Sequence, residues 1–79
     1  MVEDLIGQVF NNDGVELRRA LEAHLRVSHF RHKGYFVFEA LLTENKVAIV
    51  GTVPLDEACE RIQVTNVAVF KSNDRHPQP

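Results

Sequence analysis

The sequence predicts an α+β fold, a small two-layer sandwich in which helices cover a three-stranded sheet. Two apolar, β-branched segments flank a polar tetrad at residues 43–46, an amphipathic segment precedes them, and a third β-rich segment follows. A hairpin with apolar side chains needs a helix or further strands to shelter it from water. We therefore expect an αββαβ-like order, in which helix 1 precedes the β-hairpin, a short helix and a third strand, with a further short helix at the N-terminus.

The two helices predicted for the N-terminal part of the chain follow from the spacing of apolar residues. Residues 2–10 have helical spacing after an acidic start, which predicts the short N-terminal helix. Asp13 and Glu16 resemble a capping box and open the stronger helix. Gly34 suits the position just after a helix, so this helix is expected to end within residues 28–33. Its inner stripe consists of Leu17, Ala20, Leu21, His24, Leu25 and Ser28.

The three strands follow from β-branched and aromatic residues. Residues 35–42 and 46–53 predict the hairpin, and both of its faces are apolar. At least one strand is therefore central, or its second face meets a partner chain. Pro54 and the acidic residues after it predict a short helix over residues 55–62. Residues 63–70 predict the third strand, paired with one hairpin strand in a mixed-direction sheet.

Length and composition indicate one domain. Residues 1–70 form the expected α+β domain, and the polar, proline-containing residues 71–79 are expected to be a disordered tail. A chain of 79 residues lies near the lower limit for an unaided core, which makes oligomerisation a common means of stabilisation. The net charge of −2 argues against nucleic-acid binding, which favours a strongly basic surface.

The compartment is inferred from what the sequence lacks. The single cysteine, Cys59, has no partner for an internal disulfide, so the fold does not depend on an oxidising environment. The sequence contains neither a secretory signal nor an apolar run long enough to span a membrane. We expect a cytoplasmic protein, and a periplasmic one only if the chain is a fragment.

The main concentration of positive charge is the candidate binding site. No acidic residue occurs between positions 22 and 39, and the basic residues in that interval are expected at a helix C-terminus. Such a cluster can bind a phosphate, an anionic headgroup or an acidic segment of a partner. Alternatively, the charges only complement the helix dipole and are solvated. The candidate residues are Arg26, His29, Arg31, His32 and Lys33.

Metal binding and catalysis are the weaker interpretations. His24, His29 and His32 could contribute to a zinc site, but further ligands such as Cys59 or Glu39 are not at matching spacing. Cys59 could act as a nucleophile with His24 or His29 as base, yet its apolar neighbours are typical of a packing thiol. No phosphate-binding loop, paired-cysteine motif or nucleophile elbow occurs. We therefore expect no enzyme, and no catalytic, cofactor or metal residue.

Val47, Ile49, Gly51 and Val53 are evenly spaced at the end of the second predicted strand. This spacing resembles the V-x-L-x-G-x-V pattern of the BON domain, the bacterial OsmY and nodulation family. The start of the family's second helix is resembled by Glu57, Arg61 and Ile62. The similarity extends over about residues 14–70. It implies an αββαβ unit that attaches to phospholipid surfaces or partner proteins without catalysis, in which Gly51 is structural.

The function expected from the sequence is that of a non-enzymatic interaction module. Through its basic residues it would bind a protein partner or an anionic phospholipid surface. The alternative is a self-assembling structural or regulatory subunit, a homodimer formed through an exposed face or edge of the sheet. Neither function requires a cofactor.

Overall fold

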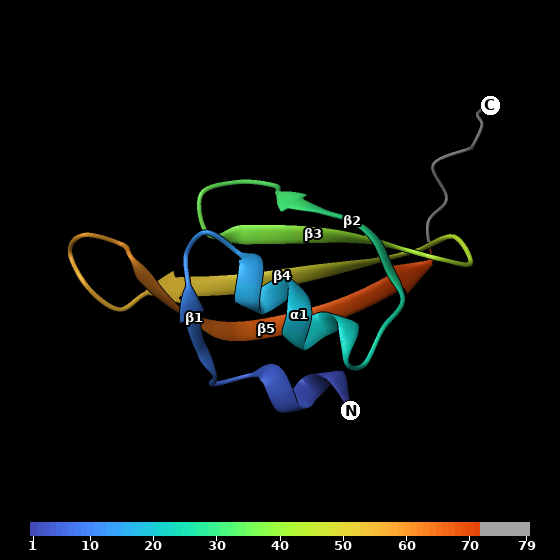
Figure 1. The fold of residues 1–79 in the computed structure, drawn as a ribbon, viewed down its shortest axis with the longest axis horizontal. Helices are drawn as coiled ribbons and strands as arrows, with labels where there is room; N and C mark the ends of the chain where they lie inside the picture. Colours follow the sequence, from blue (N-terminus) through green and yellow to red (C-terminus); the bar gives the residue numbers. More distant parts are fainter. Residues whose placement is uncertain (72–79) are drawn as a thin grey trace.

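The computed structural model describes residues 1–71, which fold around one antiparallel sheet. The elements are a 3₁₀ helix η1 (Val2–Leu5), strand β1 (Val9–Asn11), helix α1 (Val15–Glu22), and strands β2 (Val27–His32), β3 (Val37–Leu42), β4 (Lys46–Pro54) and β5 (Arg61–Lys71). The strand order is β1-β5-β4-β3-β2 (Figure 1). The predicted two-layer α+β sandwich is therefore wrong, because the described part of the chain is mostly antiparallel β with a single α-helix.

The predicted helix over residues 2–10 is only partly helical. η1 stops at Leu5, and Gly7 follows with a φ of 93°, which favours glycine and ends the helical path. Phe10 lies in β1 instead, pairs with Ile62 of β5 and is buried. The Gly7 N–H donates to the carbonyl oxygen of Val64 at 2.8 Å, which fixes this segment beside β5.

The stronger helix is confirmed at its start but ends earlier than predicted. α1 begins at Val15, whose N–H donates to Oδ1 of Asp13 at 3.0 Å, and its last residue is Glu22. The predicted capping box of Asp13 and Glu16 does not form, because the N-cap residue is Gly14, which has no side chain to accept a hydrogen bond. The residues predicted to form its last turns pair with β3 as strand β2. Phe30 stacks on Phe38 with 5.4 Å between ring centroids, so tertiary packing decides the conformation of this segment.

The central hairpin is confirmed. β3 and β4 pair with Leu42 opposite Lys46, and the turn between them places Glu44 and Asn45 at positive φ. Both strands are internal to the sheet, as their two apolar faces indicated. A register shift between β4 and β5 at Gly51 and Thr52 marks a bulge, which increases the local twist of the sheet.

The predicted short helix over residues 55–62 is wrong. Residues 55–60 form the loop between β4 and β5, where the Glu60 N–H donates to Oδ1 of Asp56 at 3.0 Å. These acidic residues therefore stabilise a loop and not a helix start. The third strand is confirmed as β5, which is antiparallel to β4 and makes no mixed-direction sheet. Of the predicted tail, only Lys71 is described, as the last residue of β5.

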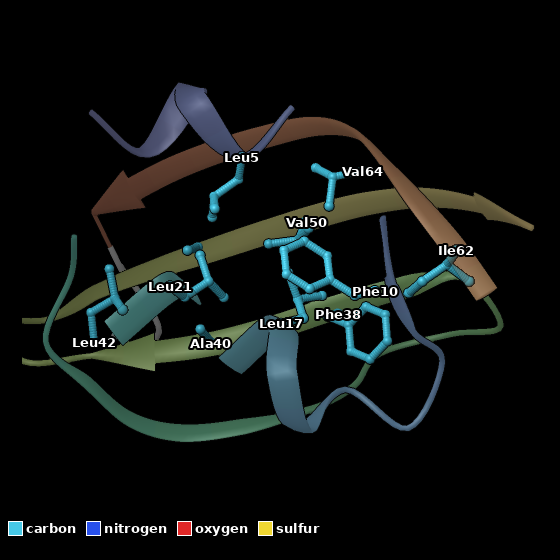
Figure 2. Packing of buried hydrophobic residues seen from close by; sticks show 11 residues of the cluster. Leu5, Phe10, Leu17, Leu21, Phe38, Ala40, Leu42, Val50, Ile62 and Val64 are labelled. Carbon is cyan, nitrogen blue, oxygen red and sulfur yellow. The ribbon is translucent and has the colours of Figure 1, made fainter. Parts of the chain in front are cut away.

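The core lies between the sheet and its two helical segments. Leu17 and Leu21 of α1 are fully buried and point toward the side chains of β3 and β4, and Leu5 of η1 points into the same space (Figure 2). We call this covered side of the sheet the inner face. The strand residues buried there include Phe38, Ala40, Leu42, Ala48, Val50, Ile62 and Val64.

Candidate functional site

The candidate basic residues lie along strand β2 and not at a helix C-terminus. β2 contains His29, Arg31 and His32, and Arg26 and Lys33 flank it. β2 is an edge strand of the sheet, with β3 as its neighbour (Figure 1). The structure therefore brings the five predicted residues together along one edge.

These residues do not share one face, because side chains alternate along a strand. Arg31 is opposite Glu39 of β3, and both lie on the outer face, away from α1, together with His29. His32 is on the inner side, where its ring packs on Phe38 with 4.2 Å between centroids. The predicted basic cluster is therefore divided between the two sides of the sheet.

Glu39 neutralises part of the positive charge. Its carboxylate lies 2.8 Å from Arg31 Nη2 and 3.8 Å from Lys33 Nζ. The Glu39 side chain is 12% exposed, whereas that of Arg31 is 69% exposed. One carboxylate is thus shared by two cations, and with Arg26 the edge keeps a net positive charge. From the sequence, Glu39 is a candidate only as a metal ligand, and its role as a shared counter-ion follows from the pairing of β2 with β3.

The geometry separates the residues of the weaker metal interpretation. His29 and His32 would be neighbours on a helix, but in β2 they lie on opposite faces of the sheet and cannot bind one ion together. Within residues 1–71, no three histidine, cysteine, aspartate or glutamate side chains are grouped closely enough to hold a metal ion.

Cys59 and His24 lie at opposite ends of strand β4. His24 lines a hollow with Thr43 and Lys46 at the start of β4, and Cys59 is in the loop that follows its end. A nine-residue strand spans about 30 Å. The two side chains are thus too far apart for a nucleophile and base pair, which requires hydrogen-bond contact.

A second hollow of about 510 Å³ lies where the β4–β5 loop meets the start of α1. Its lining contains oxygen-bearing side chains from two distant parts of the chain, and the buried Oδ1 of Asn12 has no hydrogen-bond partner among residues 1–71. No pattern in the sequence connects these segments, which meet through the pairing of β1 with β5 and through the Asn12 N–H, which donates to the Glu60 carbonyl at 2.9 Å. The lining residues are Asn11, Asn12, Asp13, Cys59 and Glu60.

The outer face of the sheet carries an apolar surface. Cross-strand partners point to the same side, so the register of β3, β4 and β5 places six apolar side chains together there. No element formed by residues 1–71 covers them, because α1 and η1 pack on the inner face (Figure 2). Leu41 is 40% exposed and Phe70 is 52% exposed. The outer apolar surface consists of Val37, Leu41, Val47, Ile49, Ala68 and Phe70.

Comparison with known proteins finds no relative of this chain. No protein-family model, curated protein or solved structure matches this chain. The similarity to BON domains therefore stays a prediction. Among residues 1–71, no helix combines the length and apolar character needed to cross a membrane.

Proposed function

We propose that this protein is a non-enzymatic assembly module in which two copies pack together through the outer apolar surface. The observation that supports this function is the asymmetry of the sheet. Its inner face is closed by α1 and η1, whereas its outer face has no cover within residues 1–71. Contiguous exposed apolar side chains on a small protein are typical of an interaction surface.

A second copy suits this surface because two sheets can pack face to face with their side chains interdigitating. On β5 the large Phe70 stands beside the small Ala68, and Val37 stands opposite Gly51, which provides both projections and recesses. The Arg31–Glu39 ion pair extends from within this surface, where Glu39 lies opposite Ile49, to Arg31 of the edge strand, and polar groups at the rim are usual in protein interfaces.

Sedimentation velocity over a range of protein concentrations tests this function. We expect the wild-type protein to dimerise and Ile49→Lys to be monomeric, because a lysine there removes apolar contact area and must lose its hydration, a cost that pairing with Glu39 on the opposite strand does not repay. Leu55→Lys is the matched control, since Leu55 is 49% exposed in the β4–β5 loop, and it should still dimerise. A wild-type protein that stays monomeric at high micromolar concentration contradicts the proposal.

Binding of an anionic phospholipid surface is the second candidate function. The net positive charge of Arg26, Arg31 and Lys33, beside the two carboxylates of Glu39 and Glu44, favours it. Co-sedimentation with vesicles containing phosphatidylserine tests it, with neutral vesicles as control. Loss of binding in the double variant Arg31→Glu, Lys33→Glu supports this function. A wild-type protein that binds neither kind of vesicle contradicts it.

A further inference from the structure

Strand β2 is a free edge with the length of a peptide-binding site. It has six residues and pairs with β3 on one side, and within the described chain no strand pairs with its other side (Figure 1). The opposite edge of the sheet is formed in part by β1, which has only three residues. A free strand edge presents backbone donors and acceptors that an additional strand can use.

The hydrogen bonds of β3 show which backbone N–H and C=O groups of β2 do not bond to β3. The Lys33 N–H donates to the Val37 carbonyl at 2.7 Å, so the backbone of Val37 faces β2. In an antiparallel pair the facing residues alternate, which makes Arg31 and His29 the residues bonded to β3. The N–H and C=O groups of Phe30 and His32 therefore point to the open side, and they have no backbone partner within residues 1–71.

The side chains along this edge favour an acidic partner. Residues 23–38 contain no acidic residue, and Glu39, the carboxylate opposite Arg31, is 12% exposed and already held by Arg31 and Lys33. Glu44 lines a hollow with Arg26, before the start of β2. An extended chain lying beside β2 would therefore meet positive charge and almost no exposed negative charge. The same charges disfavour pairing of β2 with β2 of a second copy, because like charges would face each other across the pair.

We propose that β2 accepts an extended acidic peptide segment of a partner protein as an additional strand. The backbone groups of Phe30 and His32 bind the peptide backbone, and Arg26, Arg31 and Lys33 select acidic side chains. In recognition by strand addition, main-chain hydrogen bonds supply affinity and the flanking side chains supply specificity. Arg31 lies at the rim of the outer apolar surface, but the backbone groups of Phe30 and His32 lie on the open edge of β2, so strand addition does not require dimer formation.

Fluorescence anisotropy with a labelled peptide of alternating glutamate and valine tests the proposal. We expect the wild-type protein to bind this peptide and not to bind a peptide in which lysine replaces glutamate. The variant Arg31→Glu should weaken binding by about tenfold or more, because it replaces an attractive contact by a repulsive one. Arg19→Glu is the matched control, since Arg19 is an exposed cation of α1, and it should bind like the wild-type protein.

Amide hydrogen exchange distinguishes strand addition from attraction of charge alone. The acidic peptide should slow exchange at the N–H groups of Phe30 and His32, which no electrostatic encounter would protect. Equal binding of both peptides, or binding without this protection, overturns the proposal. Binding of phosphatidylserine vesicles without binding of the peptide also overturns it and assigns the charge to a membrane. Ile49→Lys should still bind the acidic peptide, so the peptide-binding proposal and the dimer proposal can be contradicted independently of each other.

Discussion

Gly14 is the residue at which the backbone of the fold is most constrained. It precedes α1 with a φ of 83°, a conformation that residues with a Cβ rarely adopt. A Cβ built there would lie 2.9 Å from Cε2 of Phe38 and 3.1 Å from Cε2 of Phe30. The start of α1 is thus in contact with the two stacked rings of β2 and β3, which leaves room only for a hydrogen atom.

Gly14→Ala should therefore lower the free energy of unfolding by about 2–4 kcal/mol, from left-handed strain together with overpacking. Urea denaturation of the two proteins measures the difference. Gly34→Ala is the control, since a Cβ at Gly34 meets no atom within 4 Å, and it should change stability little. Equal loss in both variants would show that the contact with the rings is not the cause.

Glu39 is the residue that links the charged strand to the sheet. Because its carboxylate is 12% exposed and bonded to Arg31, Glu39→Gln should destabilise the protein by about 0.5–1 kcal/mol at low salt. Salt screens the ion pair, so the difference should shrink as sodium chloride is added. Glu22→Gln, which breaks the pair with Arg18, is the comparison and should cost less, because the Glu22 side chain is 43% exposed. A salt-independent loss would contradict an electrostatic origin.

The elements of the fold differ in how well the sequence defines them. The hairpin of β3 and β4 is predictable, because two alternating β-branched segments surround a polar turn. Residues 2–10 and 23–33 are not, because their apolar spacing fits a helix as well as a strand, and only pairing with β5 or β3 decides between them. Residues 55–60 are similarly ambiguous, because acidic residues after a proline occur both at helix starts and in loops.

The two faces of the sheet should respond differently to truncation of a leucine. Leu21→Ala removes a fully buried side chain of α1 and should cost about 2–5 kcal/mol of unfolding free energy. Leu41→Ala lies on the outer apolar surface, where the side chain is 40% exposed, and should cost about 1 kcal/mol or less in the monomer. Thermal or urea unfolding at low micromolar concentration measures both. Similar costs would mean that the outer face is covered.

The candidate site was predictable in its residues and not in its geometry. The gap in acidic residues between positions 22 and 39 identifies the basic segment without a structure. The division of His29 and His32 between two faces, and the open backbone groups of Phe30 and His32, follow only from β2 being an edge strand. The outer apolar surface was foreseen as an uncovered sheet face, but its members depend on the register of β5.

For the whole molecule, the proposed dimer makes thermal stability depend on concentration. Association favours the folded state by mass action, so the apparent Tm of the wild-type protein should rise with protein concentration. The Tm of Ile49→Lys should stay constant over the same range, because that variant is expected to remain monomeric. Differential scanning calorimetry measures both, and a wild-type Tm that is independent of concentration would contradict assembly through the outer face.

The pairing of β1 with β5 has a consequence for the order of folding. β2 to β5 form a meander of sequence neighbours, whereas β1 reaches β5 from the opposite end of the chain with only three paired residues. Closing so large a loop is slow in comparison with forming hairpins. We expect the N-terminal segment to dock last and to detach first, so pulsed-labelling mass spectrometry during refolding should find peptides of residues 1–11 protected after those of residues 37–54.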